Sequence, residues 1–407
     1  MSKNILVFSD GTANDTGGRA HQGDVTIEPN SAVSNIYRLF VASRPHNSTG
    51  ITAEQQVAFY DPGLGSTEEA TQLASAGSSG FGLLPRKIYS LASRATGLGI
   101  TRNILDCYRF LVEQYEPGDR IFLFGFSRGA YTVRSLGGLI TLLGVLKKPA
   151  DEKPDKLLKQ SVEIYKIRNE VQRKAAADAV KDQYHQVAPH AICVFDTVRA
   201  LGATGGIANN ISRLTERFAP HEFHDHHLSD QVPFAFHAVS IDENRKHFAA
   251  ELWENDPAPH EAFEQRWFPG VHSDIGGSYP DGDTGTGRDL GRMSLEWMLS
   301  RLQQHNTGFL VNTQKLDLKP AADAAHYHLG EQHDERSRRS LLGLIPTGWL
   351  WPIGYRQKAS DAPLEPDAND VWRVGQLDQR VDARFTAQSD YRPQALRLHL
   401  QFKDRYH

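Results

Sequence analysis

Short hydrophobic runs alternate with longer stretches of helical periodicity through the first three quarters of the chain. The runs have the length of buried strands and are bounded by turn-forming residues. Apolar positions spaced three and four apart follow several of them and predict amphipathic helices. This alternation predicts an α/β fold, a mostly parallel sheet covered by helices on both faces. The predicted strands are 4–9, 57–60, 121–124, 191–195, 234–241 and 265–268.

Two predicted helices flank the hydrophobic run at 121–124. The preceding helix begins near Thr101, which can cap it, and ends before a Pro-Gly pair. Residues 121–131 read IFLFGFSRGAY, so Ser127 lies between two glycines where the strand ends and the next helix begins. A GxSxG sequence in that context predicts a nucleophile elbow, a sharp turn that exposes the serine hydroxyl.

The remaining pattern predicts two additions to a single elaborated domain over 1–407. A charged helical stretch within 147–190 predicts a solvated helical insertion. From 306 to 407 the periodicity weakens, which predicts an irregular C-terminal extension. The sequence LLGLIPTGWLWPIGY at 341–355 is an apolar island within it. Two interpretations of the island stay open: a lid that faces lipid, since tryptophan suits membrane interfaces, or a segment packed on the core.

Composition excludes some functions without choosing one. The formal net charge is −4 and the basic residues are scattered, so no basic face for nucleic acid is expected. Cys107 and Cys193 are the only cysteines, and their apolar surroundings predict buried thiols and no disulfide. The sequence shows no signal-peptide pattern and no apolar run that spans a bilayer, so we expect a chain that is cytoplasmic as synthesised.

Further residues supply what a serine nucleophile needs, namely a base, an acid that orients the base, and oxyanion donors. Asp196 and Asp242 end two successive predicted strands, and His272 follows the last one. The order Ser, Asp, His is that of the α/β-hydrolase fold. An aspartate after a strand is more often a turn or helix cap. In combination with the elbow at Ser127, however, these residues predict a serine hydrolase.

Several sequences, in order along residues 4–300, resemble one family. GFSRGAY, PGVHSDIGG, SDGTAND, FYDPGLG and VFDTVRALG are similar to an uncharacterised α/β-hydrolase family that includes the type VI secretion phospholipase effectors of the first lipase class. The resemblance implies cleavage of ester bonds, in characterised members those of phospholipids, through a triad of Ser127, Asp196 and His272. It also implies a lipid substrate, transient membrane contact, export by a type VI system, and a secretion or immunity protein as partner.

The acid of the triad has two candidates. The acid of an α/β-hydrolase usually follows the strand before the last, which favours Asp242, whereas the family motif favours Asp196. A triad acid is buried and accepts the Nδ1 proton of the base. Asp242 has the alternative of capping the next segment or pairing with Arg245, a role that Glu243 shares. We expect Asp196 to be the acid.

The oxyanion donors are expected to be backbone N–H groups. One is the N–H of Arg128, directly after the nucleophile, and the other comes from the loop after the first strand, at Gly11 or Thr12. For Asp10 we expect local capping, and two alternatives stay open: shaping of that loop, or binding of a cation. The loop sequence SDGT also resembles the haloacid dehalogenase phosphatases, which need an aspartate nucleophile at the position of Phe8. The phosphatase interpretation fails at that residue.

No metal and no other cofactor is expected. HEFHDHH at 221–227 carries residue types that bind zinc, but a serine mechanism needs no metal and the resembling family has a similar His-Asp pair. We predict a serine hydrolase of carboxylic esters that is phospholipase A-like. Two alternatives stay open: an esterase for an acyl ester other than a phospholipid, and a catalytically inactive hydrolase fold that serves as a binding module.

Overall fold

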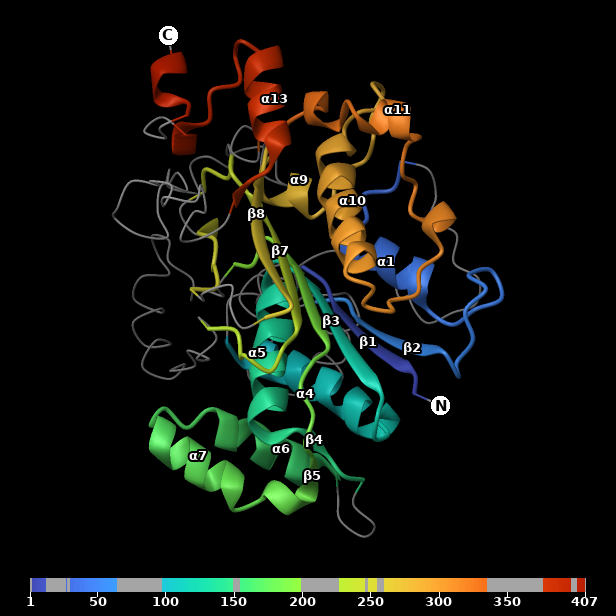
Figure 1. The fold of residues 1–407 in the computed structure, drawn as a ribbon, viewed down its shortest axis with the longest axis vertical. Helices are drawn as coiled ribbons and strands as arrows, with labels where there is room; N and C mark the ends of the chain where they lie inside the picture. The colour runs from blue at the N-terminus through green and yellow to red at the C-terminus, as the bar shows by residue number, and fades with distance from the viewer. Residues whose placement is uncertain are drawn as a thin grey trace, which may run out of the picture.

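A sheet of seven strands runs through the middle of the described part of the molecule (Figure 1). Its order is β2-β1-β3-β6-β7-β8-β9, and every neighbouring pair is parallel. The strands are β1 Asn4–Ser9, β2 Gln56–Asp61, β3 Arg120–Phe126, β6 Ala191–Phe195, β7 Phe234–Ser240, β8 Ala262–Phe268 and β9 Gln376–Leu377. The computed structural model describes residues 2–11, 27, 30–63, 97–148, 154–198, 227–245, 248–254, 260–334, 376–396 and 401–406.

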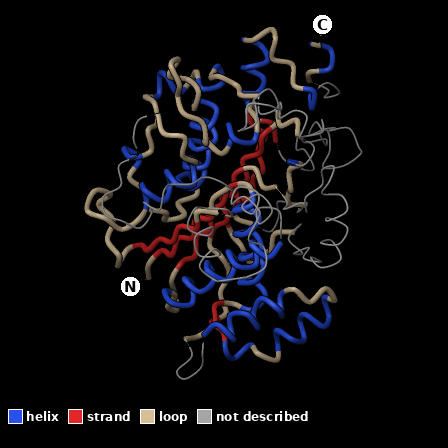
Figure 2. The backbone as a smooth tube through the Cα atoms, turned by 180° about the vertical axis from the view of Figure 1, so that it is seen from behind, coloured by secondary structure: helices blue, strands red, loops and turns tan. Residues whose placement is uncertain are grey.

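Helices cover both faces of this sheet, so the predicted fold class is confirmed. Helices α4 and α5 lie on one face, and α1 and α10 lie on the other (Figure 1). Seen from behind, the strands form one continuous band between them (Figure 2). The helices are α1 Asn35–Ser43, α4 Gly97–Gln114, α5 Arg128–Leu143, α6 Pro154–Tyr165, α7 Glu170–Asp178, α9 His272–Ile275, α10 Asp289–Gln304, α11 Ala321–Ala324 and α13 Gln379–Ala387.

The boundaries agree with the hydrophobic pattern where the pattern is strong. Strands β1 and β6 have the predicted bounds, and the other four predicted strands differ only at their ends. Strand β9 and the pair β4 Val145–Leu146 and β5 Tyr184–His185 were not predicted, because two-residue strands carry no periodicity. Thr101 is not the cap of α4, because the residues from Gly97 onward already have helical backbone.

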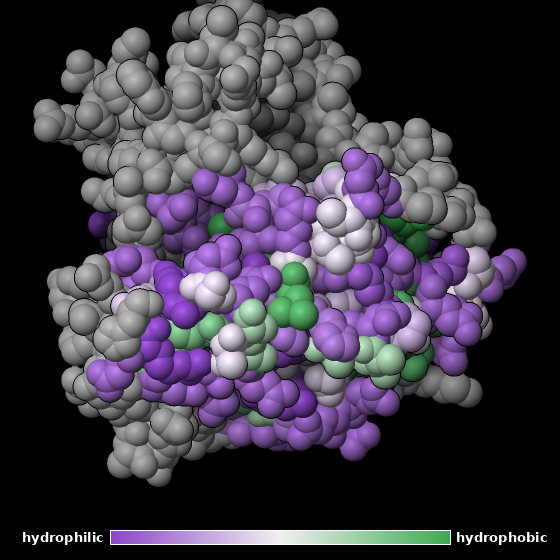
Figure 3. Space-filling model, turned by 90° about the horizontal axis from the view of Figure 1, so that it is seen from above, coloured by the Kyte–Doolittle hydropathy of each residue, from purple (hydrophilic) through white to green (hydrophobic). Residues whose placement is uncertain are grey.

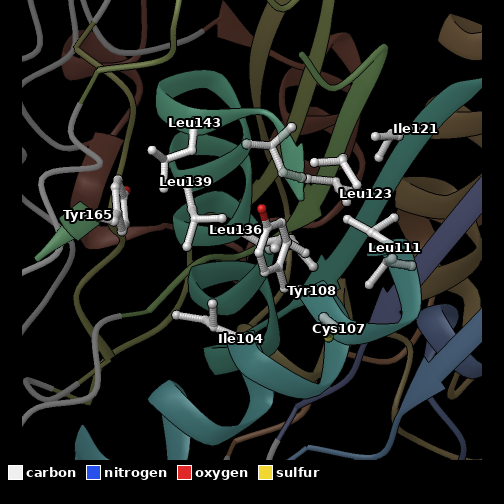
Figure 4. Packing of buried hydrophobic residues seen from close by; sticks show 14 of the residues in the cluster. Ile104, Cys107, Tyr108, Leu111, Ile121, Leu123, Leu136, Leu139, Leu143 and Tyr165 are labelled. Carbon is white, nitrogen blue, oxygen red and sulfur yellow. The ribbon is translucent and has the colours of Figure 1, made fainter. Parts of the chain in front are cut away.

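Alternate side chains of the central strands enter two separate cores, as the pleat of a strand requires. In β1, Ile5 and Val7 pack with α4, α5 and α6, whereas Leu6 and Phe8 pack with α1 and α10. A fully buried aliphatic side chain stabilises the fold by about 1.5–3 kcal/mol. Figure 4 shows part of the first core: Ile104, Cys107, Tyr108 and Leu111 from α4, Ile121 and Leu123 from β3, Leu136, Leu139 and Leu143 from α5, and Tyr165 from α6.

The two predicted additions contain short helices in their described parts. Helix α6 buries Leu158 and Val162 against the first core, so the stretch within 147–190 is less solvated than its charge suggests. The described C-terminal residues pack beside the ends of β7 and β8 and form a third core there. This core includes Val239, Ile241, Leu252, Trp267, Val381, Phe385, Tyr391, Leu396 and Phe402.

Cys107 and Cys193 are buried free thiols, as predicted, and burial raises the pKa of both. Among the helices in the described ranges, none combines the length and hydrophobicity that crossing a membrane requires.

The contact between α5 and the end of β1 predicts unequal effects of two glycine substitutions in one helix. A Cβ atom at Gly129 would lie 2.1 Å from the backbone oxygen of Ser9. One at Gly137 would meet side-chain atoms, with the Cδ1 tip of Ile192 at 2.7 Å as its one close contact. We expect Gly129→Ala to destabilise the protein by about 1–3 kcal/mol, because backbone atoms must separate. Gly137→Ala should change stability by less than about 1 kcal/mol, since the higher helix propensity of alanine offsets a small repacking. Thermal unfolding measures both, and equal losses would contradict this account.

Candidate active site

Ser127 stands at a sharp turn between β3 and α5. Its backbone has φ 59° and ψ −124°, a combination that is strained for a residue with a side chain. The glycines of the motif permit the turn. A Cβ atom at Gly125 would lie 2.5 Å from Cα of Ala130, and one at Gly129 would strike the end of β1. The local structure is therefore the strand, elbow and helix that the GxSxG sequence predicts.

The three residues that the family motifs single out form one hydrogen-bonded chain. Nε2 of His272 lies 2.8 Å from Oγ of Ser127, and Nδ1 of His272 lies 2.6 Å from Oδ2 of Asp196. They follow the carboxyl ends of β8, β3 and β6, which lie at one edge of the sheet. All three side chains are buried: the exposed fraction is 4% for His272, 6% for Ser127 and 0% for Asp196. With the proton on Nδ1, the imidazole donates to the carboxylate and accepts from the serine hydroxyl.

Ser240, at the end of β7, holds the carboxylate of Asp196 from the other side. Its backbone N–H donates to Oδ1 at 2.9 Å, and its hydroxyl donates to Oδ2 at 3.2 Å. Asp196 itself has a positive φ of 41°, and its backbone N–H donates to the carbonyl of Ala238. Among the described residues, the carboxylate accepts from the imidazole of His272 and from both the N–H and the hydroxyl of Ser240. Sequence reasoning missed Ser240, whose only signal is a hydroxyl at the end of an apolar strand.

Two aromatic rings confine the imidazole of His272. Phe126 stacks on it with centroids 4.7 Å apart, and Phe248 meets it edge-on at 5.1 Å. These contacts restrict the rotation of the ring, so its two nitrogens stay directed at Ser127 and Asp196. The sequence marks neither phenylalanine as part of a site, because buried phenylalanine is common in any core.

Asp242 makes a different set of contacts. Its Oδ2 accepts from the backbone N–H of Gly270 at 2.6 Å and from the hydroxyl of Tyr391 at 3.0 Å. Glu243, and not Asp242, pairs with Arg245, at 2.8 Å. Burial raises the pKa of Asp242 to about 7.

The loop after β1 is organised by Asp10. The carboxylate of Asp10 accepts from the N–H of Gly11 at 2.6 Å, from the hydroxyl of Ser34 at 2.5 Å and from the hydroxyl of Tyr60 at 2.7 Å. Asp10 thus accepts locally from Gly11, as expected of a cap, and also ties the loop to two more distant residues. The N–H of Gly11, one of the two candidates for the single oxyanion donor expected from this loop, already donates to Asp10. Arg128 opens α5 beside Ser127.

Several predicted features lie outside the described residues. They are Thr12, positions 221–226 of the histidine-rich sequence, and the apolar island at 341–355 with Trp349 and Trp351. His227, the last histidine of that sequence, is described and exposed. Within the described ranges, no three His, Cys, Asp or Glu side chains gather in a way that would hold a metal ion.

Comparison with known proteins places the chain in a family. Residues 3–301 match the family model described as "T6SS, Phospholipase effector Tle1-like, catalytic domain", so the chain belongs to this family of type VI secretion phospholipase effectors. The resemblance drawn from the sequence is thereby confirmed. The match contains Ser127, Asp196 and His272 and ends before the described C-terminal residues.

One curated relative and two solved structures are similar to the chain. An uncharacterized protein of Saccharomyces cerevisiae is 27% identical over 258 residues, which cover 60% of this chain and 32% of that protein, so the chain spans about a third of the relative's length. An uncharacterized protein from Pseudomonas aeruginosa has 18% identity and a TM-score of 0.38, over 79% of this chain and 48% of that one. The Tle1 effector bound to the VgrG spike of the type 6 secretion system has 17% identity and a TM-score of 0.38, over 82% and 81%.

The raised pKa of Asp242 predicts how its replacement changes stability with pH. The pKa of an unfolded aspartate is about 4, so protons bind more tightly in the folded state. The resulting stabilisation is complete below about pH 4 and is lost as the pH rises through about 7. Asp242→Asn cannot titrate. Its melting temperature relative to the unchanged protein should therefore increase between about pH 5 and pH 8.

Asp61 supplies the control for this measurement. Burial raises its pKa to about 6, so Asp61→Asn should show an increase of the same sign with its midpoint at lower pH. A difference in melting temperature that stays constant across the range would contradict the pKa of Asp242.

Proposed function

We propose that this protein is a serine esterase of the phospholipase A type, which cleaves carboxylic ester bonds of lipids through a triad of Ser127, His272 and Asp196. The observation that carries the proposal is the hydrogen-bonded chain from the Ser127 hydroxyl to the Asp196 carboxylate. The protein that contains these hydrogen bonds belongs to a family of phospholipase effectors. A strained serine, a buried base and a buried acid in contact are the requirements of nucleophilic acyl transfer.

The proposed reaction proceeds through an acyl-enzyme. Oγ of Ser127 attacks the acyl carbonyl carbon while Nε2 of His272 takes the hydroxyl proton. Asp196 keeps the Nδ1 proton facing its carboxylate and stabilises the imidazolium that forms. The tetrahedral intermediate collapses as His272 returns the proton to the leaving alcohol. Water then attacks the acyl-enzyme with His272 again as base, which releases the fatty acid and restores Ser127.

Backbone N–H groups would hold the negative oxygen of the intermediate. The N–H of Arg128 is at the N-terminus of α5, where helix geometry directs donors and partial positive charge toward the end of the helix. The second donor belongs to the loop that follows β1. Because Asp10 engages the N–H of Gly11, Thr12 is the candidate that this hydrogen bond favours.

Lipid is the proposed substrate class, because the family description names phospholipase effectors. The face seen in Figure 3 is mainly hydrophilic in its described part, with hydrophobic residues in small separate groups. For this chain we propose transient membrane contact and delivery by a type VI secretion system. The Tle1 effector of the solved complex is bound to a VgrG spike, and a spike protein of that class is the partner we propose here.

Replacement of Ser127 tests the hypothesis that the protein is a serine hydrolase. We expect Ser127→Ala to lower turnover of phospholipid by several orders of magnitude with the fold intact, because His272 and Asp196 then have nothing to activate. Ser135→Ala is the matched control: Ser135 is a buried serine of α5, the helix that follows Ser127, and its hydroxyl has no hydrogen-bond partner among the described residues. It should keep full activity. A fluorophosphonate probe should label the control and not Ser127→Ala.

Three outcomes separate the alternatives. Turnover by a folded Ser127→Ala protein would end the serine-hydrolase reading. If the unchanged protein is neither labelled by the probe nor able to hydrolyse esters, the remaining interpretation is a catalytically inactive fold that serves as a binding module. Hydrolysis of short acyl esters, with no product from a panel of phospholipids followed by mass spectrometry, would leave the general esterase.

Amide substitutions test which aspartate is the acid. Asp196→Asn should lose up to about 10⁴ in turnover, since the amide stabilises the wrong imidazole tautomer. Asp242→Asn should lower turnover by at most about tenfold. Among the described residues, Asp242 contacts Gly270 and Tyr391 and makes no hydrogen bond to the imidazole of His272, so its replacement removes ordinary hydrogen bonds only. Turnover and melting temperature are to be measured side by side. A large loss confined to Asp242→Asn, at unchanged stability, would transfer the role to Asp242.

A further inference from the structure

The loop that carries His272 is held by an unusual set of acceptors. Three successive backbone N–H groups of this loop each donate to a different carboxylate. Gly270 donates to Asp242 at 2.6 Å. Val271 donates to Asp274 at 2.9 Å, and His272 donates to Glu243 at 3.2 Å. We call these three acids the carboxylate cradle.

The cradle is costly to build, which argues that it serves the position of the loop. Glu243 and Asp274 are buried, with exposed fractions of 1% and 2%, and a buried carboxylate destabilises a fold unless donors surround it. The loop also needs a glycine. Gly270 has φ 122°, and a Cβ atom there would lie 2.8 Å from Cβ of Asp274. Both features constrain the backbone directly before His272.

Each acid of the cradle has a second donor, and these donors come from different parts of the chain. Glu243 is neutralised locally by Arg245. Asp242 accepts from the hydroxyl of Tyr391 at 3.0 Å. Asp274 accepts from Nδ1 of His333 at 2.7 Å, and the ring of His333 stacks on Tyr279 with centroids 3.6 Å apart.

Two of these donors lie beyond the part of the chain that matches the family model. The match ends at residue 301, whereas His333 and Tyr391 belong to the C-terminal residues. Tyr391 is also part of the third core, which packs the C-terminal residues against β7 and β8. The C-terminal part of the chain therefore reaches the loop of His272 through two carboxylates, those of Asp242 and Asp274.

We propose that Asp242, Glu243 and Asp274 are positioning residues for His272, and that His333 and Tyr391 complete the active site by fixing two of these acids. The inference rests on the proposed function, since it assigns roles around the same base. His272 must keep Nε2 at hydrogen-bond distance from Ser127 and Nδ1 at hydrogen-bond distance from Asp196. A displacement of about 1 Å is enough to lower a rate by about 10². A backbone held at three successive N–H groups resists such a displacement.

Two conservative substitutions remove the outer donors and leave the cradle in place. Tyr391→Phe deletes one hydroxyl and keeps the ring under Arg384. His333→Phe deletes the imidazole donor, keeps the backbone N–H that reaches Asp274 at 3.4 Å, and keeps an aromatic ring on Tyr279. The matched control is Tyr327→Phe, a buried tyrosine of the C-terminal part whose hydroxyl accepts from the backbone N–H of Lys319, away from the cradle.

We expect Tyr391→Phe and His333→Phe each to lower kcat for a short soluble ester by roughly 5- to 10-fold, with KM changed less than about twofold. The double variant should lose more than either single variant. Tyr327→Phe should keep kcat. The rate of fluorophosphonate labelling of Ser127 should fall in parallel with kcat, and the low-field proton resonance of the His272 Nδ1–H should shift or broaden in the two variants but not in the control.

These measurements separate failure of this inference from failure of the proposed function. A wild-type protein that neither reacts with the probe nor cleaves esters would refute both. A reactive wild-type protein whose Tyr391→Phe and His333→Phe variants keep their labelling rate, kcat and Nδ1–H resonance would refute the positioning role alone. A lower melting temperature of these two variants at an unchanged rate would also refute the positioning role. It would show that the two hydrogen bonds stabilise the fold without affecting His272.

Discussion

Helix α5 begins directly against the end of the central strands, and the site depends on that close approach. Gly125 and Gly129 let the backbone turn within van der Waals distance of β1 and of the first turn of the helix. The turn holds Ser127 at a positive φ. This conformation costs about 1–3 kcal/mol, and it persists because the packing of the surrounding cores is more favourable than that cost. Because both faces of the sheet are packed, the turn cannot relax without opening one of the two cores. The same packing holds the start of α5 and the loop after β1 side by side, which is where oxyanion donors are needed.

Parallel strands place successive loops at one edge of the sheet, but they do not decide which side chains meet there. Asp196 and Asp242 follow neighbouring strands, and both are surrounded by buried groups. The left-handed backbone at Asp196, together with Ser240 on the next strand, turns that carboxylate toward His272. Asp242 lies two residues beyond β7 and faces Gly270. A small difference in backbone direction thus gives two aspartates of similar sequence context different contacts.

Buried acidic side chains are concentrated at the edge of the sheet that carries the proposed triad. Asp10, Asp196, Glu243 and Asp274 are all nearly inaccessible, and each accepts several hydrogen bonds from nearby backbone or hydroxyl groups. Such groups are retained at a cost in stability, since apolar residues of similar size would pack there without desolvated charge. In exchange the loops acquire a single arrangement. Removal of one partner would leave an unpaired charge, so these hydrogen bonds also make the arrangement hard to alter piece by piece.

The sequence alone determined the elements and the order of the chemistry. Strong periodicity located six of the seven strands of the sheet, and GxSxG between a strand and a helix located the elbow at Ser127, because those signals are local. Motif order identified His272 and favoured Asp196, but left Asp242 open. Only the tertiary structure shows that Asp196, and not Asp242, contacts His272. The direction of a side chain after a strand depends on backbone angles and on neighbours distant in sequence. For the same reason Ser240, Phe126 and Phe248, and the cradle with its links to His333 and Tyr391, carry no sequence signal: each contact joins segments that only the fold brings together.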